Sequence, residues 1–556
     1  MEKFHWSVDS LAHRDGLFLS IGWAFHETLE ILQLFLRVHL ADGTVEPIKA
    51  SIAQSRYDVF DKFDGFPYAL RSGFLIRGGC RYPDAAIDRV SLFAELENGE
   101  TFEAEIPPSS TMQLTLNGAS NPKLALVGRF GDLCNRAVAR LKKGELRIVV
   151  EKSRKFLSEA LIPKVEQASK VEMLLGPNES ENVVLIVDHD MGGGANQFSR
   201  ALIDERINGG ATVLVLCYRV QSFTCVLKIK GSRIDQEVAI PDYAFMVDLA
   251  AKIKLKEIIY NNAVSFNQPE AVARLIIELK RRHGSFLRVF VHDFFAVCPS
   301  HTLLNNFGTF CNIPALTECK GCLDTNTEGF ATFYRARDIV EWRAIWGRLI
   351  SMADEVNAFS EDSTSLLRKA YPLIDGKRMR VEHHKMTHFA PREINISQTG
   401  ELRIGVVGMI APHKGAKIVR GISEEIRRRG LSVQIVVLGR VEDHCDESVV
   451  RQTDDYRVED LPDLVEKSGI NLMLFPSIWP ETFSYVAQEL IEMNLPVACF
   501  DLGAPAERIR NYGKGHILKD ADPAMVLDEL ISFHERIYSS GTNKHATNTR
   551  IHQCSA

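Results

Sequence analysis

The chain has 556 residues, enough for roughly two to four domains. Its apolar content of 45% and charged content of 25% are ordinary for a soluble globular protein. A net charge of −6 and a pI near 6.3 do not favour nucleic-acid binding. No apolar run reaches membrane-spanning length, and MEKFHWSVDS lacks a signal-peptide core, so a cytoplasmic protein is expected.

Residues 1–112 are predicted to form a β-sandwich that acts as an accessory domain. The segments LFLSIGWAF, ILQLFLRVHL and RVSLFAEL are rich in alternating apolar, β-branched and aromatic residues. Asp42-Gly43 and Asn98-Gly99 each join two such runs, which is a strong hairpin signal. A Pro-Pro-Ser-Ser stretch at 107–110 closes the domain.

Residues 113–180 are predicted to be a helical connector. Within them, AVARLKKGELRIVVEKSRKFLSEALIPKVEQ places Leu, Ile and Val among Lys, Arg and Glu at helical spacing. The basic residues are either a solvated helix face or a contact for an anionic membrane surface. The second reading would make the protein a peripheral membrane protein at the inner face of the cytoplasmic membrane.

From residue 181 onward, strands and helices alternate, which is typical of a doubly wound parallel α/β sheet. VVLIVD (183–188) is a buried strand, SRALIDERI continues a helix, and TVLVLCYRV is the next strand. The pattern restarts at LRIGVVGMI (402–410). The prediction is two Rossmann-like domains, 181–395 and 396–540, with a cleft between them and a polar tail at 541–556. In such sheets ligands bind beyond the carboxyl ends of the strands.

Two motifs follow strands of the first α/β domain. Gly192-Gly193-Gly194 lies between a strand and a helix, where a loop without Cβ atoms can pass close under a ligand. The alternative is a tight turn. His292-Asp293 follows the strand VFV, and the histidine is either a ligand contact or a neutral structural side chain.

Four of the eleven cysteines fall within 25 residues of one another and end in a CxxC pair. Four soft ligands so close could form a structural zinc site. Their spacing does not match a standard ribbon or finger, so unliganded thiols or a redox-labile pair at 319 and 322 stay as alternatives. The candidate ligands are Cys298, Cys311, Cys319 and Cys322.

The second α/β domain carries the densest group of motifs. Gly408 to Gly415 follows its first strand and contains Lys414. Gly439-Arg440 ends the next strand, and Arg457-Val458 precedes a helix. For each of these the alternative is a surface side chain or a turn.

The stretch LMLFPSIWPETFSYVAQE (472–489) is the most informative of these motifs. An apolar strand runs into a proline-broken loop with Glu481, and a helix is predicted to start at Thr482 and to carry Glu489. The amides near Thr482, Phe483 and Ser484 would then form a helix N-terminus that favours an anion such as a diphosphate. The two carboxylates could accept hydrogen bonds from sugar hydroxyls.

These motifs resemble the retaining glycosyltransferases of the GT-B fold, family 4, with Glu481 and Glu489 as its E-x7-E pair. The resemblance implies that Glu481 binds the donor sugar, that Glu489 binds the ribose, and that Arg457-Val458 lies near the nucleobase. Gly193 and Gly194 match the family's GG loop, and His292 matches a histidine near the reacting carbon. Gly408 and Lys414 match its G-R…K-G motif, whose lysine neutralises the diphosphate. The family's arginine is Met409 here, and Arg440 or His413 could take its place.

Four segments are most similar to bacterial enzymes that build rhamnose- or mannose-type surface polysaccharides. They are HKGA, RVEDLPDLV, FPSIWPETFSY and DLGAPAERI. The resemblance implies transfer of a sugar from a nucleotide-diphosphate donor to a growing polysaccharide or lipid-linked glycan. It also implies same-face attack, without a protein base or catalytic metal. Two alternatives are a non-catalytic glycan-binding protein on a degenerate transferase scaffold and a sugar-nucleotide epimerase.

Overall fold

The computed structural model describes residues 3–82, 84–107, 111–113, 166–326, 338–386, 392–394, 396, 401–453 and 456–547. The chain forms two compact units. Unit 1 comprises Met1–Ala358 and Leu366–Arg380, and unit 2 comprises Phe359–Ser365 and Val381–Ala556. The second unit therefore takes up the chain again at Val381, earlier than the predicted domain boundary at 396.

The N-terminal part of unit 1 is one eight-stranded sheet with the order β7-β6-β3-β4-β5-β2-β1-β8. The two predicted hairpins are confirmed, because Asp42-Gly43 joins β3 to β4 and Asn98-Gly99 joins β6 to β7. The elements are β1 (Phe4–Arg14), β2 (Leu17–His26), β3 (Ile31–Leu40), β4 (Val45–Gln54), α1 (Tyr57–Lys62), β5 (Gly73–Gly79), β6 (Ile87–Leu96), β7 (Thr101–Glu105) and β8 (Thr111–Gln113).

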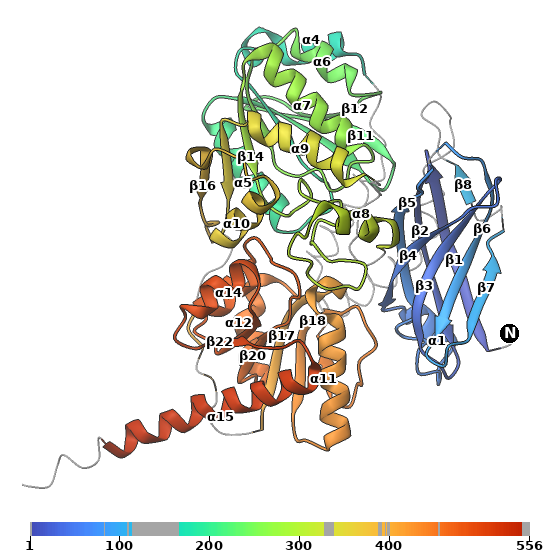
Figure 1. The fold of residues 1–556 in the computed structure, drawn as a ribbon, viewed down its shortest axis with the longest axis vertical. Helices are drawn as coiled ribbons and strands as arrows, with labels where there is room; N and C mark the ends of the chain where they lie inside the picture. The colour runs from blue at the N-terminus through green and yellow to red at the C-terminus, as the bar shows by residue number, and fades with distance from the viewer. Residues whose placement is uncertain are drawn as a thin grey trace, which may run out of the picture. The chain divides into compact units, whose positions relative to one another are not determined.

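The predicted sandwich of two sheets is wrong in one respect, because β4 belongs to both halves. Its first residues pair with β3, and from Ala50 onward it pairs with β5, with a register shift between Ser51 and Gln54. Apolar side chains of both halves, such as Ile76 and Leu92, share one core. A single sheet curled around that core replaces the sandwich (Figure 1).

The rest of unit 1 is a second eight-stranded sheet with the order β12-β11-β10-β9-β13-β14-β15-β16. From β10 to β15 neighbouring strands are parallel, as predicted. β11 and β12 are antiparallel additions that the prediction missed. The connection Val220–Phe223 between β10 and β11 is too short for a parallel crossover, which needs a dozen or more residues.

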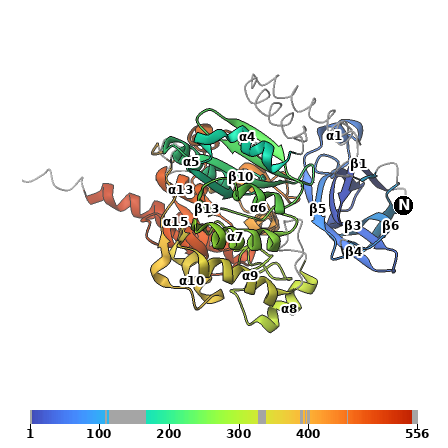
Figure 2. The ribbon, with the colours of Figure 1, turned by 90° about the horizontal axis from the view of Figure 1, so that it is seen from above.

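Helices α7 and α9 of this unit pack beside each other (Figure 2). Of the predicted connector 113–180, residues 114–165 lie outside the described residues. The elements are α4 (Ala168–Glu179), β9 (Val183–Val187), α5 (Gly194–Asn208), β10 (Thr212–Arg219), β11 (Thr224–Lys230), β12 (Asp235–Ala239), α6 (Ala244–Ala250), β13 (Leu255–Tyr260), α7 (Pro269–His283), β14 (Phe286–Phe290), α8 (Leu316–Thr325), α9 (Ile339–Met352), β15 (Glu355–Ala358), α10 (Glu361–Ala370), η2 (Gly376–Arg378) and β16 (Met379–Val381). The first half of α10, up to Ser365, belongs to unit 2.

Unit 2 contains a six-stranded parallel sheet with the order β19-β18-β17-β20-β21-β22. Successive strand residues face opposite cores, so Val406 and Val407 lie in different apolar clusters. Helices α11 and α15 contribute to one cluster, and α12, α13 and α14 contribute to the other. A parallel sheet covered on both faces is what the alternating pattern predicts.

The elements of unit 2 are β17 (Arg403–Ile410), η3 (Pro412–Lys414), α11 (Ala416–Arg429), β18 (Gln434–Val441), β19 (Val450–Gln452), η4 (Val458–Asp460), α12 (Leu461–Ser468), β20 (Leu472–Phe475), α13 (Tyr485–Glu492), β21 (Val497–Phe500), α14 (Gly503–Arg510), β22 (Gly515–Leu518) and α15 (Pro523–Thr547). Because α15 continues to Thr547, the first residues of the predicted polar tail are helical. Residues 548–556 lie outside the described residues.

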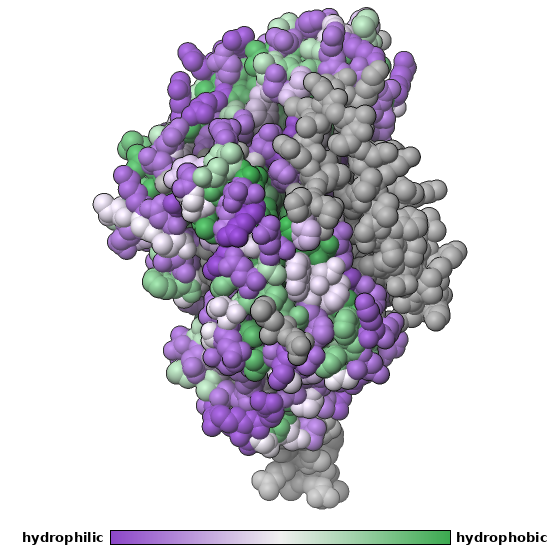
Figure 3. All heavy atoms as spheres, turned by 90° about the vertical axis from the view of Figure 1, so that its right-hand side faces the viewer, coloured by the Kyte–Doolittle hydropathy of each residue, from purple (hydrophilic) through white to green (hydrophobic). Residues whose placement is uncertain are grey.

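In the part of the chain that the structure describes, no helix combines the length and apolarity that a membrane crossing requires. Figure 3 shows one face of the molecule, where hydrophilic residues predominate and described hydrophobic residues gather only in small groups.

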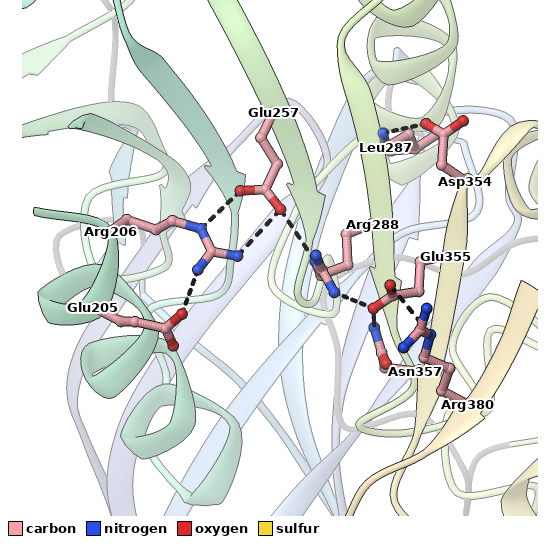
Figure 4. A network of polar contacts seen from close by, with 9 residues as sticks. All are labelled: Glu205, Arg206, Glu257, Leu287, Arg288, Asp354, Glu355, Asn357 and Arg380. Atoms are coloured by element: carbon pink, nitrogen blue, oxygen red, sulfur yellow. Dashed lines mark hydrogen bonds and ion pairs between the residues drawn. The ribbon is translucent and has the colours of Figure 1, made fainter. Parts of the chain in front are cut away.

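A row of alternating charges crosses the sheet of β13, β14, β15 and β16 in unit 1 (Figure 4). Arg206 Nε donates to Glu257 at 2.7 Å, and Arg288 Nε donates to the same carboxylate at 3.1 Å. Arg288 also pairs with Glu355, which Arg380 approaches at 3.4 Å. Arg288 thus separates two carboxylates that are only 13% and 11% exposed.

We expect Arg288→Met to lower the free energy of unfolding by about 2–4 kcal/mol, because it leaves two largely buried carboxylates without the cation between them. The matched control is Arg274→Met, whose ion pair with Glu341 is 59% and 62% exposed. That control should cost less than about 1 kcal/mol. Urea unfolding of both variants checks the difference, and equal losses would contradict a structural role for this row.

Candidate functional site

The loops at the carboxyl ends of β17, β20 and β21 in unit 2 are held together by close backbone contacts. A Cβ added at Gly415 would lie 2.1 Å from the carbonyl oxygen of Pro476, and Gly415 has a φ of 87°. A Cβ added at Gly503 would lie 2.6 Å from the carbonyl oxygen of Glu481. The amide of Ala504 donates to that same oxygen at 2.8 Å. The Lys414 loop, the Glu481 loop and the start of α14 are therefore packed backbone against backbone.

Helix α13 begins at Tyr485, three residues later than predicted. Ser484 is its N-cap, and the Ser484 Oγ accepts a hydrogen bond from the amide of Ala487 at 3.3 Å. Serine favours this position because its oxygen satisfies an amide that has no partner inside the helix. Ser484 has a φ of 64° and a ψ of 104°, a strained conformation for a residue with a Cβ. Thr482 and Phe483 thus belong to the loop.

The structure places Glu481 on this loop and Glu489 in α13, one turn beyond its start, and both are buried. The Glu489 carboxylate lies near Tyr456. Burial, with a smaller contribution from Glu489, raises the pKa of the Tyr456 hydroxyl. The predicted pair of carboxylates therefore lies beyond the end of β20. Glu489 is near Tyr456, which directly precedes Arg457 and Val458 in the sequence.

Phe483 is buried and its side chain is part of an aromatic cluster. Its ring stacks on His384 with centroids 4.5 Å apart, and the ring of Phe359 lies edge-on to the same imidazole with centroids 4.0 Å apart. Burial lowers the pKa of His384 to about 3 and raises that of Tyr485 to about 12. His384 is therefore neutral at neutral pH, and its Nδ1 lies 2.5 Å from the Tyr485 hydroxyl, within hydrogen-bond distance. The Phe483 ring is therefore part of the interior packing of unit 2.

Arg508 of α14 is a site residue that the sequence analysis missed. Its guanidinium donates to the carbonyl of Ser484 at 3.1 Å, to Oε1 of Gln488 at 2.8 Å and to the carbonyl of Ala504 at 3.3 Å. It lies 4.4 Å from the centroid of the Phe483 ring. Burial lowers the pKa of Arg508 to about 10, and Glu481 acts in the opposite direction. The charge thus stays on Arg508 at neutral pH and lies within electrostatic range of Glu481.

Lys414 lies in the 3-10 helix η3, directly before Gly415. Met409, at the position of the family's arginine, is 47% exposed. In the register of β17 and β18, Arg440 stands directly opposite Met409. Since paired residues of neighbouring strands project to the same face of a sheet, Arg440 lies next to position 409, where the resemblance leads us to expect an arginine. The His413 ring instead lies edge-on to Trp479, with centroids 6.1 Å apart.

Gly408 has a φ of 107°, and no atom lies within 4 Å of a Cβ added there. Arg457 forms two hydrogen bonds to the Asp460 carboxylate, at 2.8 and 2.7 Å, and is 56% exposed. Val458 packs against the apolar core. Gly408 thus has open space beside it near the end of β17, whereas the charge of Arg457 is compensated by Asp460 on the surface.

In unit 1 the glycine loop lies between β9 and α5, as predicted. Gly192 and Gly193 have φ values of 86° and 91°, and Gly194 is the first residue of the helix. The amide of Gly192 donates to Oδ1 of Asn196 at 2.6 Å. The loop is therefore held from within α5, with open space on the side where Cβ atoms would project.

His292 follows β14, and its Nε2 lies 2.8 Å from Oδ1 of Asn261. Asn261 in turn donates to the buried carboxylate of Asp188, which follows β9. Sequence reasoning missed Asp188, Asn196 and Asn261. A signal was present, because VVLIVD, IIYNN and VFVHD each place polar residues directly after a buried strand.

The four cysteines border one cavity of about 440 Å³ in unit 1, near α8. Burial raises the pKa of the Cys298, Cys311 and Cys319 thiols, which disfavours the thiolate form that binds metal. Among the described residues, which include these four, no group of three metal-ligating side chains is arranged to hold an ion. The arrangement does not fit the predicted zinc site.

We expect Arg508→Met to lower the free energy of unfolding by about 2 kcal/mol, since it strands buried carbonyl groups that a charged donor now satisfies. Hydrogen exchange of the segment 480–490 should speed up. Arg508→Lys should recover only part of both losses, because an ammonium cannot donate along the same three directions.

The matched control is Arg510→Met, two residues further along α14, where the ion pair with Asp501 is 51% and 63% exposed. It should change neither the unfolding free energy by more than about 1 kcal/mol nor the exchange of the loop. Unchanged exchange at 480–490 in Arg508→Met would show that the guanidinium does not hold the loop.

No protein-family model matches the sequence, and no curated protein matches it. Among solved structures, the chain is similar to HepE from Anabaena in complex with UDP-glucose, with 13% identity, coverage of 64% of this chain and 90% of that chain, and a TM-score of 0.42. Sucrose-phosphate synthase from Thermosynechococcus elongatus shows 13% identity, coverage of 66% and 100%, and a TM-score of 0.40. The catalytic domain of starch synthase IV from Arabidopsis thaliana, bound to ADP and acarbose, shows 12% identity, coverage of 65% and 92%, and a TM-score of 0.39.

Proposed function

We propose that the chain is a retaining glycosyltransferase of the GT-B type that transfers a sugar from a nucleotide-diphosphate donor to a surface polysaccharide or lipid-linked glycan. The observation that carries the proposal is the placement of Glu481 and Glu489, one on the loop after β20 and one in α13, beside the Lys414 loop. In this reading unit 2 binds the donor. Lys414 and the amides of Thr482, Phe483 and Ser484 hold the diphosphate.

The roles of the two carboxylates follow from the resemblance. Glu481 would bind the hydroxyls of the donor sugar, and Glu489 those of the ribose. The backbone contacts of Gly415 and Gly503 support this reading, because they hold the cation-bearing loop and the carboxylate-bearing loop at a constant separation. Preorganised charges of this kind stabilise a departing diphosphate without reorganisation.

A non-catalytic glycan-binding protein is the second candidate, and Met409 is the observation that favours it. The register of β17 and β18 weakens this objection, because it puts Arg440 beside Met409. The two functions differ in one product. The enzyme releases a nucleoside diphosphate from its sugar donor, whereas a binding protein does not.

Thermal-shift screening against UDP-, GDP- and dTDP-sugars, followed by an assay for nucleoside diphosphate release, tests the proposal. Glu481→Ala should lower kcat by roughly 100-fold or more, because it removes a contact to the reacting sugar. Glu489→Gln should mainly raise the donor KM, if its contact is equal in the ground and transition states. Glu466→Gln on α12 is the carboxylate control, with expected wild-type kinetics. Wild-type turnover in Glu481→Ala, or no release by the wild type with any donor, would overturn the proposal.

The diphosphate site is tested separately with the two cations. Lys414→Met and Arg440→Met should each weaken binding of the free nucleoside diphosphate by roughly 10- to 100-fold, the value of one charge-assisted hydrogen bond of about 1.5–3 kcal/mol. Lys417→Met, an exposed lysine at the start of α11, is the charge-matched control. Calorimetric titration measures all three. Equal affinities in Arg440→Met and Lys417→Met would remove Arg440 from the site.

A further inference from the structure

We infer that Asp188 and Asn261 are positioning residues that hold the imidazole of His292 in one tautomer, with its proton on Nε2. The inference rests on the proposed function in giving His292 a substrate role, but the tautomer itself follows from unit 1 alone. Asp188 is 3% exposed and Asn261 is 1% exposed, so water cannot easily replace these contacts.

The orientation of the Asn261 amide is set by its neighbours. Its Nδ2 lies 2.9 Å from Oδ1 of Asp188 and 3.4 Å from the carbonyl oxygen of Ala195. A carboxylate and a carbonyl can only accept hydrogen bonds, so the NH₂ group must face them. The Asn261 Oδ1 therefore faces His292, whose Nε2 lies 2.8 Å away. An amide oxygen only accepts, so His292 must donate from Nε2.

The Asp188 carboxylate is the anchor of this arrangement. Besides the Asn261 amide, its Oδ1 accepts from the amide of His189 at 2.8 Å, and its Oδ2 accepts from Nδ2 of Asn196 at 3.1 Å. Burial raises the pKa of the Asp188 carboxyl, and the hydrogen bonds from Asn261 and from the His189 amide act to lower it. Three donors converging on one buried carboxyl keep it in the accepting role that turns Asn261 toward His292.

The same carboxylate also connects His292 to the glycine loop. Asn196, which donates to Asp188, accepts from the amide of Gly192 at 2.6 Å. One buried group therefore sets both the path of the loop at 192–194 and the tautomer of the histidine. The glycine loop and His292 are the two motifs that the sequence places after strands of the first α/β domain.

The tautomer fixes which ring nitrogen of His292 donates a hydrogen bond and which accepts one. A neutral imidazole with its proton on Nε2 has Nδ1 as its acceptor atom. Its Nε2 partner is an uncharged amide, which stabilises an imidazolium less than a directly bonded carboxylate does. In this tautomer Nδ1 is the atom that could accept a hydrogen bond from a neutral hydroxyl, as on a sugar.

Two-bond proton–nitrogen correlation spectra of the full chain, labelled with ¹⁵N-histidine, test the inference. His292→Gln identifies the His292 signals by their loss. The wild type should show the Nε2–H tautomer of His292 at neutral pH. Asp188→Asn places a group that can also donate opposite Asn261, and Asn261→Ser removes the link to His292. Both variants should lose the preference for the Nε2–H form. The control is Asn262→Ser, which breaks a neighbouring 2.8 Å bond to Asp293 and should leave the His292 tautomer unchanged.

The Nδ1–H tautomer in the wild type would overturn the inference, even if both variants fail to fold. So would an unchanged tautomer in folded Asp188→Asn and Asn261→Ser. If the wild type transfers sugar, kcat of Asn261→Ser should fall roughly tenfold or more at an unchanged donor KM, the effect of losing one orienting hydrogen bond. Failure of the proposed function would appear as a wild type that releases no nucleoside diphosphate, a result that leaves the tautomer measurement intact.

Discussion

The candidate site of unit 2 depends on backbone packing at two glycines. Gly415 lies against the carbonyl of Pro476, and Gly503 lies against Glu481, at distances that leave no room for a Cβ. Because backbone atoms cannot rotate out of the way, these contacts set where the three loops run. The carboxylates and the lysine acquire their positions from that constraint. Any residue with a Cβ at position 415 or 503 would push apart the loops that carry Lys414 and Glu481.

In each unit a charged side chain, buried in the case of Asp188 and half-buried in the case of Arg508, organises a candidate site element. Arg508 donates to carbonyl groups of the Glu481 loop and of α14, and Asp188 accepts from the amides around the glycine loop and His292. Burying a charge is costly unless hydrogen bonds compensate it, so each group holds its partners to a narrow geometry. The two residues act in the same way with opposite charge. Asp188 lies outside the motifs by which the sequence resembles a transferase family, and Arg508 lies within DLGAPAERI without a role assigned to it there.

The N-terminal sheet belongs to unit 1 and is joined to it by side chains. Arg14 donates to the carbonyl of Phe223 at 3.0 Å, and Arg81 forms an ion pair with Asp324 at 3.1 Å. Arg77 of β5 lies 3.6 Å from the Sδ of Met191, beside the glycine loop. Arg77 is also close enough to act on His301, whose pKa burial lowers. The sheet that composition suggested as a separate accessory domain is thus in contact with the candidate site of its unit.

The sequence by itself determined the elements that local chemistry specifies. The apolar runs 183–187 and 472–475 predict buried strands, and Asp42-Gly43 and Asn98-Gly99 predict hairpins. Both signals, an uninterrupted apolar run and a turn-forming dipeptide, are made of residues that neighbour one another in the sequence. Glu481, Lys414 and the glycine loop could be found because each lies within about six residues of the end of an apolar strand. The tertiary structure alone decided that β4 joins two halves into one curled sheet and that Arg440 stands opposite Met409. It alone decided that Arg508 and Asp188 face the loops they hold. Those facts depend on which side chains meet across long stretches of chain, and packing, not local preference, chooses those partners.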